Sequence, residues 1–338
     1  MITQSHFIGI DVSKLTLDVY VKSTDQHLTA DNNEAGFAFI LTFVKEQQID
    51  ISDALFCFEN TGMYSKPLAH FMQNNRYTFL EAHPLDVKQS LGAVRGKNDK
   101  IDAMRLAMYA YRKREELKPT KALSPHCERL QLLASLRRKL VTERGGLVAR
   151  RGEMTQVLKL CRQDVLIAVQ DALIAELNKQ IKILDKEIQL VIKSSQELLN
   201  SYTLLLSIVG VGPVVATALL IYTGNFTKFN TAREFAAYCG LIPYDHQSGT
   251  SVRRNKKTSR LANQEMKSLL DRGATSVIAH DEDMKAYYER RVKAGKAERS
   301  VINAVRCKIV DPVFTVIKEQ RPSIRKASDY QIFKNKAA

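Results

Sequence analysis

The sequence predicts two fold classes in one chain, an α/β front domain with a mixed sheet followed by a mostly helical remainder. Three patterns predict this. Short β-rich runs alternate with helical stretches in the first third, and apolar residues then recur every three or four positions over 125–200. An uncharged run over 198–227 precedes a last helical region. Strands that alternate with helices are typical of α/β domains, and long amphipathic stretches are typical of helical ones.

The front domain begins with two β-rich runs within 6–22, separated by a polar break at 11–14 that predicts a strand, a turn and a strand. Two later runs, 53–59 and 77–82, are apolar and of buried-strand length. The predicted helices of this domain lie near 34–48, near 64–74 and from Asp99 towards 116. An antiparallel start followed by alternating strands and helices predicts a mixed sheet.

The segment 125–200 carries leucine, isoleucine and valine at helical spacing, with Lys and Glu on the other faces. The apolar positions are Leu130, Leu133, Leu136, Leu140, Leu173, Leu177, Ile181, Leu184, Ile188 and Val191. Long amphipathic helices follow from this pattern, either as a coiled-coil arm or as an ordinary helical bundle.

The uncharged run is long enough to span a bilayer, but Gly210, Gly212 and Pro213 interrupt its middle. We therefore predict two short buried helices around a glycine turn and no membrane segment. This turn resembles a helix-hairpin-helix, in which backbone N–H groups at a helix N-terminus hold a DNA phosphate. Gly210 and Gly212 are thus candidate DNA-binding residues. Five widely spaced cysteines without a Cys/His cluster favour a reducing cytoplasm.

A polar segment over 244–260 is predicted to be a loop, and five of its last eight residues are basic. A serine on a cation-rich loop can attack phosphorus when a base or metal removes its proton and cations hold the phosphate. The candidate residues are Ser248, Arg253, Arg254, Lys256 and Lys257. The alternative is a solvated loop that only grips the nucleic-acid backbone. Residues 261–320 are predicted to be helical, with a basic face from Lys285 to Arg299.

Charge is unevenly distributed along the 338 residues, whose net charge is +15. Residues 1–110 contain 10 Lys and Arg against 13 Asp and Glu, whereas residues 111–338 contain 41 against 23 and carry a net charge of +18. A strongly basic remainder predicts a polyanionic partner, most often nucleic acid. We place the predicted boundaries at 1–120, 121–200 and 201–325, with a loose tail over 326–338.

Four carboxylates of the front domain are placed where they can converge. Asp11 and Glu59 end apolar runs, and Asp99 and Asp102 open a helix three residues apart. Strand ends project into the crevice above a sheet, and positions i and i+3 share one helix face. Converging carboxylates call for a cation, and all-oxygen ligands suit Mg²⁺ or Mn²⁺. Each residue also has an ordinary interpretation, because Asp99 can cap its helix, Asp11 can initiate a turn and Glu59 can open a plain loop.

A rival interpretation comes from another class of enzyme. Gly9 to Ser13 followed by a hairpin resembles the first phosphate loop of sugar kinases related to actin. Those enzymes place a glycine two residues after the aspartate, where this chain has Ser13, and the sequence shows no second glycine-rich nucleotide loop. The kinase interpretation is therefore weak.

In combination, six segments resemble the DEDD transposases of bacterial insertion sequences, the IS-one-ten family that includes the Piv DNA invertases. The segments are GIDVSK (9–14), ENTG (59–62), KNDKIDA (97–103), SIVGVGPVVATALL (207–220), EFAAYCGLIP (234–243) and SGTSVRR (248–254). The resemblance runs in order from about residue 6 to about residue 310. Two departures are mild, because Val209 stands where Pro is frequent and Thr250 replaces a common Ser.

The resemblance implies an RNase H-like front domain similar to the Holliday-junction resolvase RuvC, a coiled-coil arm and a C-terminal transposase domain. It implies that Asp11, Glu59, Asp99 and Asp102 are a metal-binding quartet and that Ser248 is the nucleophile that forms a covalent 5′-phosphoserine link to DNA. It also implies donor and target DNA, a bridge RNA, and homodimers that pair into a tetramer, in a bacterial cytoplasm at the nucleoid. We therefore expect a Mg²⁺-dependent, RNA-guided DNA recombinase. The alternatives are a junction-resolving nuclease that uses water, and a non-enzymatic nucleic-acid-binding protein.

Overall fold

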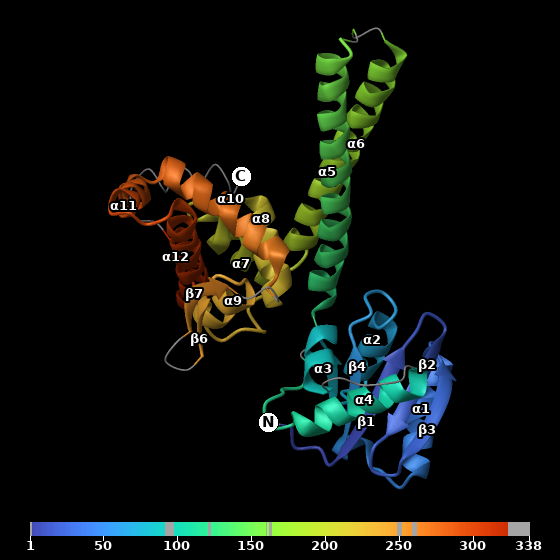
Figure 1. Ribbon diagram of the computed structural model, residues 1–338. Coiled ribbons are helices and arrows are strands. Elements are labelled where there is room, and N and C mark those ends of the chain that lie inside the picture. The colour runs from blue at the N-terminus through green and yellow to red at the C-terminus, as the bar shows by residue number, and fades with distance from the viewer. Residues whose placement is uncertain are drawn as a thin grey trace. The chain divides into compact units, whose positions relative to one another are not determined.

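The computed structural model describes residues 2–91, 98–120, 123–159, 161, 164–248, 252–258 and 262–323. The chain divides into two compact units, Met1–Ala122 and Leu123–Ala338, which we call the front unit and the rear unit. Each is described by itself (Figure 1).

The front unit is a five-stranded mixed sheet in the order β3-β2-β1-β4-β5, with helices on both faces (Figure 1). The first three strands are antiparallel, and β1, β4 and β5 are parallel. The strands are β1 His6–Val12, β2 Thr16–Val21, β3 Gln26–Asp31, β4 Ala54–Glu59 and β5 Phe79–Ala82. The helices are α1 Glu34–Glu46, η1 Ile51–Asp53 (a 3-10 turn), α2 Lys66–Asn74, α3 Pro84–Leu91 and α4 Asp99–Arg112. The predicted mixed sheet is confirmed.

Two apolar clusters lie on opposite faces of this sheet. One packs α1 and α2 against side chains such as Ile10 and Phe58, and the other packs α3 and α4 against Cys57 and Leu80. Strand β4 is buried on both faces up to its last residue, Glu59. This burial explains why β4 is nearly continuously apolar and why its first polar side chain stands at the sheet edge.

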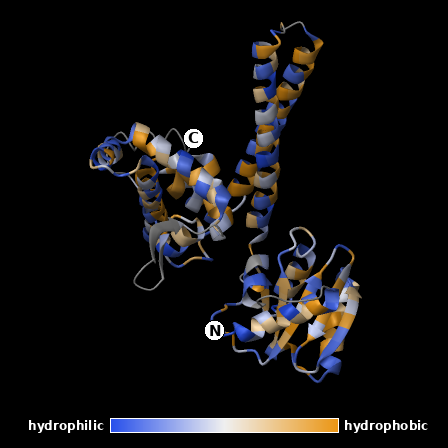
Figure 2. Ribbon diagram, in the orientation of Figure 1, coloured by the Kyte–Doolittle hydropathy of each residue, from blue (hydrophilic) through white to orange (hydrophobic). Residues whose placement is uncertain are grey.

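The rear unit begins with a long antiparallel helix pair, α5 Pro125–Val157 and α6 Val165–Lys193, which we call the arm (Figure 1). Three arginines of α5, spaced seven residues apart, contact partners on α6 with the same spacing. The pairs are Arg137–Asp185, Arg144–Asn178 and Arg151–Asp171. Apolar and polar residues alternate along both helices (Figure 2), and a seven-residue repeat of contacts is typical of a coiled coil.

The body of the rear unit consists of short helices packed around the base of the arm, where Leu130, Leu133, Ile188 and Ile192 enter one core. Its elements are α7 Gln196–Leu206, α8 Pro213–Thr223, α9 Ala232–Tyr238, β6 Pro243–Ser248, β7 Val252–Thr258, α10 Gln264–His280, α11 Glu282–Lys293 and α12 Glu298–Glu319.

The uncharged run forms α7 and α8, which confirms the predicted pair of short helices around a glycine turn. No helix in the described ranges is long and apolar enough to cross a membrane. The predicted loop over 244–260 is wrong in part, because 243–248 and 252–258 pair as an antiparallel hairpin. Its strands are too polar to be recognised by hydrophobic alternation.

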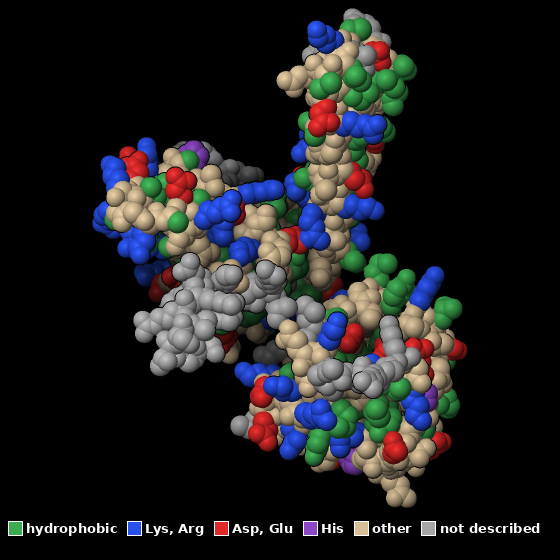
Figure 3. All heavy atoms as spheres, viewed as in Figure 1, with side chains coloured by type: hydrophobic (Ala, Val, Ile, Leu, Met, Phe, Trp, Pro, Cys, Tyr) green, Lys and Arg blue, Asp and Glu red, His purple; other side chains and the backbone are tan. Residues whose placement is uncertain are grey.

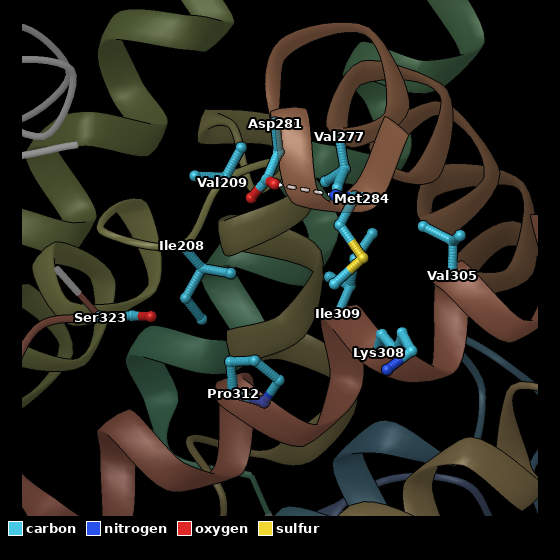
Figure 4. A pocket seen from close by; sticks show the side chains of 10 residues that line it. All are labelled: Ile208, Val209, Val277, Asp281, Met284, Val305, Lys308, Ile309, Pro312 and Ser323. Atoms are coloured by element: carbon cyan, nitrogen blue, oxygen red, sulfur yellow. Dashed lines mark hydrogen bonds between the residues drawn. The ribbon is translucent and has the colours of Figure 1, made fainter. Parts of the chain in front are cut away.

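A hollow lies where α12 contains Pro312, between the α7–α8 turn and the junction of α10 with α11 (Figure 4). Proline has no N–H, so it breaks the regular hydrogen bonding of the helix at this point. Ile208, Val277 and Met284 line the hollow, and the carboxylate of Asp281 accepts a hydrogen bond from the Met284 N–H at 3.0 Å. All the residues that line the hollow belong to the rear unit.

Candidate active site

Asp11 and Glu59 stand side by side at the carboxyl edge of the sheet. Strands β1 and β4 are parallel, with Ile10 beside Phe58, so the next residues along each strand are Asp11 and Glu59. Alternation along the strands places both on the face covered by α4.

Helix α4 brings the other two carboxylates to this face. Asp99 and Asp102 lie in its first turn, and the N-cap is Asn98, whose side chain accepts a hydrogen bond from the Ile101 N–H at 2.8 Å. The interpretation of Asp99 as a mere helix cap is therefore wrong. Asp102 accepts a hydrogen bond from Arg105 on the same helix.

Gly9 allows α4 to approach the sheet this closely. A Cβ atom at this position would lie 1.9 Å from the backbone oxygen of Ala103 and 2.5 Å from the Ala107 nitrogen. Both contacts are with backbone, which cannot move aside, so only glycine fits. Since Gly9 is two residues before Asp11, and Ala103 follows Asp102, the contact fixes the distance between strand end and helix start.

The electrostatics of the four carboxylates indicate that their charges interact. The pKa of Asp11 is raised to about 6, first by burial and then by the charges of Asp102, Asp99, Glu59 and Asp18, in that order. The pKa of Glu59 is also raised, first by burial and then by Asp102. Raised carboxyl pKa values at a sheet edge are typical of a functional site.

A plain loop does follow Glu59 before α2, but the turns after β1 and β4 are closed without the carboxylates of Asp11 and Glu59. The turn after β1 is closed by Ser13, whose N–H donates to the Thr16 carbonyl at 3.0 Å. The turn after β4 is made by Asn60, whose side chain accepts from the Gly62 N–H at 3.1 Å. Neither turn uses the preceding carboxylate.

Sequence reasoning missed Asp18, which lies directly opposite Asp11 in the antiparallel register. Its carboxylate is held by the Thr29 hydroxyl at 2.8 Å and lies 3.0 Å from Nε2 of His27. Like charges placed directly opposite on a sheet destabilise it, so these two contacts offset a cost. The signal was weak, because a single Asp within a strand of ordinary alternation does not stand out.

The donor set at this edge consists of carboxylate oxygens, the ligands that Mg²⁺ and Mn²⁺ prefer. Within the described ranges, no three His, Cys, Asp or Glu side chains are gathered closely enough to form a complete metal site. By their chemistry the four carboxylates suit a hard divalent cation, although in the part of the chain that the structure describes their side chains are not gathered into a metal site.

The raised pKa of Asp11 predicts a stability effect with a definite sign. Because its folded-state pKa, about 6, exceeds the ordinary value of 3.8, the folded chain gains stability from the bound proton at low pH and loses it as pH rises through about 6. In chelator, Asp11→Asn should therefore raise the melting temperature at pH 8 by a few degrees, about 2–4 °C.

Thermal unfolding measured from pH 4 to pH 8 tests this expectation, and the difference from wild type should shrink below pH 6. Glu115→Gln is the control, because that side chain is 80% exposed. A lower melting temperature for Asp11→Asn at pH 8 would show that the site is not electrostatically strained.

In the rear unit, Ser248 is the last residue of β6 and pairs in register with Val252, the first described residue of β7. Arg253 pairs with Gln247, and Arg254 with His246. Lys256 and Lys257 follow on the same strand. The structure describes only the backbone of Ser248 and of these four basic residues, and Gly249, Thr250 and Ser251 lie outside the described residues.

The two glycines of the α7–α8 turn have different surroundings. Gly210 has a φ of +85°, and a Cβ there would lie 2.3 Å from Cγ2 of Val277 and 2.8 Å from the Gly273 oxygen. It is required for packing against α10. Gly212 is the N-cap of α8, and nothing lies within 4 Å of its added Cβ. Of the pair, Gly212 is the one placed to approach a ligand.

Comparison with known proteins identifies the family. A model of DEDD transposases of the IS110 type matches residues 8–161, and the model described as "Transposase IS116/IS110/IS902 family" matches residues 202–289. Each carboxylate of the quartet lies in the first match, and the glycine turn and Ser248 hairpin lie in the second. The chain belongs to the IS110 family of DEDD transposases.

Relatives of this IS110-family transposase include a DNA-inverting protein. The chain is 28% identical over 328 residues to the pilin gene-inverting protein of Moraxella bovis, covering 94% of this chain and 97% of that one. The protein of the same description from Moraxella lacunata matches equally. An uncharacterised 43.6 kDa protein of insertion element IS110 from Streptomyces coelicolor is 29% identical over 115 residues, 34% of this chain and 28% of that one. The protein is therefore a DNA transposase or recombinase, and the kinase and non-enzymatic interpretations are wrong.

Proposed function

We propose that this transposase cuts and rejoins DNA strands with a divalent metal held by Asp11, Glu59, Asp99 and Asp102 and with Ser248 as nucleophile. The observation that carries the proposal is the convergence of two parallel strand ends and one helix N-terminus on a single sheet face, where burial and the neighbouring carboxylates raise the pKa of Asp11 and of Glu59. The strand order, with three antiparallel strands followed by two parallel ones, supports an RNase H-like, RuvC-like front unit.

When bound, Mg²⁺ or Mn²⁺ would activate a nucleophile and stabilise the charge on a leaving oxygen. The chain's own residues supply the rest. Gly9 sets the spacing of α4 against β1, and the Thr29 and His27 contacts keep Asp18 from moving towards Asp11. Arg105 holds Asp102 in position on α4.

In the proposed strand transfer, the Ser248 hydroxyl attacks the scissile phosphorus. A bond forms between the serine oxygen and phosphorus, so the 5′ end of the DNA becomes attached to the protein as a 5′-phosphoserine. The bond between phosphorus and the 3′ oxygen breaks, and that oxygen leaves with the proton of the serine hydroxyl. Rejoining reverses these steps. Arg253, Arg254, Lys256 and Lys257 supply positive charge beside the attacked phosphate. Gly212 and the N–H groups that open α8 hold a further DNA phosphate in the manner of a helix-hairpin-helix.

The runner-up is a junction-resolving endonuclease, in which the quartet activates water and Ser248 is idle. Its products would carry free 5′-phosphates, whereas the serine mechanism passes through a protein–DNA adduct. The pilin gene-inverting relatives favour strand exchange over simple cutting, because inversion requires both cutting and rejoining.

The proposed partners are donor and target DNA and a bridge RNA, bound by a homodimer that pairs into a tetramer at the bacterial nucleoid. The net charge of +18 over residues 111–338 exceeds what a short DNA site requires. We propose that the part of this charge carried by the arm binds a structured RNA through shape and phosphate contacts, together with the front unit.

Recombination between two plasmids tests the function and its RNA dependence together. Protein purified from cells that express the element's flanking sequence should carry one discrete RNA and recombine plasmids in Mg²⁺. RNase-treated, RNA-free protein should not, and adding the RNA back should restore activity. Full recombination by RNA-free protein would refute the RNA, and no strand cutting under any condition would refute the enzymatic proposal.

A further inference from the structure

The junction between α11 and α12 carries five basic residues within ten positions and one carboxylate, Glu298. We call these five the basic corner: Arg290, Arg291, Lys293, Lys296 and Arg299. All are exposed, as is every residue from 293 to 300. Lys and Arg side chains are gathered on the part of the rear unit that contains α11 (Figure 3). The corner lies beyond residue 289, where the second family match ends.

Within the described ranges, the five residues of the basic corner lack carboxylate partners, unlike several arginines elsewhere in the rear unit. Arg137 pairs with Asp185, Arg151 with Asp171, and Arg306 with Asp271. Among the residues that the structure describes, none of the five corner residues forms an ion pair. The Arg290 guanidinium lies over the Tyr287 ring, 5.9 Å from its centroid. The folded chain therefore leaves this charge available to an external anion.

Helix stability does not account for the corner. Arg290, Arg291 and Lys293 occupy the last turn of α11, where cations favour the helix dipole. Lys296, however, lies in the intervening turn, and Arg299 lies in the first turn of α12, where the dipole disfavours a cation. Cations on both sides of the junction also repel one another.

The two helices that flank the basic corner, α11 and α12, are packed against the rest of the rear unit. Met284 of α11 enters the hollow beside Pro312 (Figure 4), and the Tyr287 ring lies under the Lys308 ammonium, 4.9 Å from the centroid. On α12, Val301 and Val305 are buried. Gly295 makes the turn with a φ of +79°, and nothing lies within 4 Å of its added Cβ. The flanking helices are thus packed into the rear unit, while the corner itself is open to solvent.

We infer that the basic corner binds the phosphate backbone of duplex DNA next to the cut site. The corner itself, residues 290–299, has no aromatic side chain on which an unstacked base could stack, and the ring of the preceding Tyr287 contacts Arg290 and Lys308, which disfavours single strands. A cluster of cations without a stacking platform suits the regular phosphates of a duplex. The choice of DNA over RNA rests on the proposed function, because the same unit carries the Ser248 hairpin.

The test compares two charge-matched double variants at opposite ends of α12. Lys293→Gln with Lys296→Gln removes two corner cations, and Lys318→Gln with Arg321→Gln removes two cations near the other end. Binding of catalytically inactive protein to duplex DNA is measured against salt concentration. We expect the corner variant to bind about 10-fold more weakly and to lower the salt slope by about 2, while the control remains near wild type. Lys293→Arg with Lys296→Arg should restore binding.

Equal losses in both double variants would overturn the inference, since net charge alone would explain them. A loss for duplex RNA but not for duplex DNA would also overturn it and make the corner an RNA surface. If the corner variant binds DNA normally and wild-type protein still cuts DNA in Mg²⁺, the inference about the basic corner is refuted and the proposed function stands. If wild-type protein binds DNA more tightly than the corner variant but never cuts it, the proposed function is refuted and the inference about the basic corner stands.

Discussion

Asp11→Asn and Glu59→Gln should each abolish strand cleavage while leaving DNA affinity largely unchanged. Each substitution keeps the side-chain size and removes one negative charge from a site in which burial and neighbouring carboxylates raise the pKa of Asp11 and of Glu59. A cation held by four carboxylates is bound less tightly by three and is placed less accurately. The expected fall in cleavage rate is about a thousandfold or more, the scale seen when a group that stabilises developing charge is lost.

Affinity should survive because it arises from the cationic rear unit rather than from the acidic front unit. Cleavage of a labelled duplex and binding of the same duplex are therefore measured side by side, with Glu115→Gln as the exposed control. Full recombination by Asp11→Asn combined with Asp102→Asn would end the metal-site hypothesis. Loss of binding together with cleavage would show instead that the substitutions unfold the front unit.

The quartet could be predicted because its four carboxylates stand at positions that the apolar runs and the helical spacing of the sequence identify. Asp11 and Glu59 each follow an apolar run, and parallel strands bring such ends to one edge. The spacing of Asp99 and Asp102 predicts a shared helix face. What brings that helix to the strands is Gly9, whose contact with the Ala103 backbone depends on tertiary packing and could not be derived from local pattern.

The elements that were missed are helix α3, Pro84–Leu91, and several polar strands. Strand β3, Gln26–Asp31, is an edge strand with one buried residue, Ala30, so it lacks apolar alternation. The β6–β7 hairpin is dense in charge, so its sequence shows no apolar alternation, although its strands pair in antiparallel register. The heptad of arginine contacts in the arm was also missed, because apolar spacing predicts the helices but not which polar pairs join them.

The hairpin raises the question of which hydroxyl attacks DNA. A serine hydroxyl is a poor nucleophile unless it is deprotonated, and the segment 244–260 offers His246 and, among carboxylates, only Asp245. Activation must therefore come from outside the hairpin, and we assign it to the quartet, whether of the same chain or of a second copy. Ser248 ends β6, and Gly249 beside it permits the close backbone approach that a phosphate requires.

Ser248→Ala should accordingly lose both cleavage and the covalent protein–DNA adduct, whereas Ser251→Ala should retain the adduct. Denaturing gels of protein incubated with end-labelled DNA in Mg²⁺ show the adduct directly, and Thr250→Ala serves as the neighbouring control. If Ser251→Ala loses the adduct and Ser248→Ala keeps it, the nucleophile lies three residues further along the chain. If both variants cut DNA and leave free 5′-phosphates, water is the nucleophile, the resolvase alternative holds, and the cations of β7 serve only to grip the backbone.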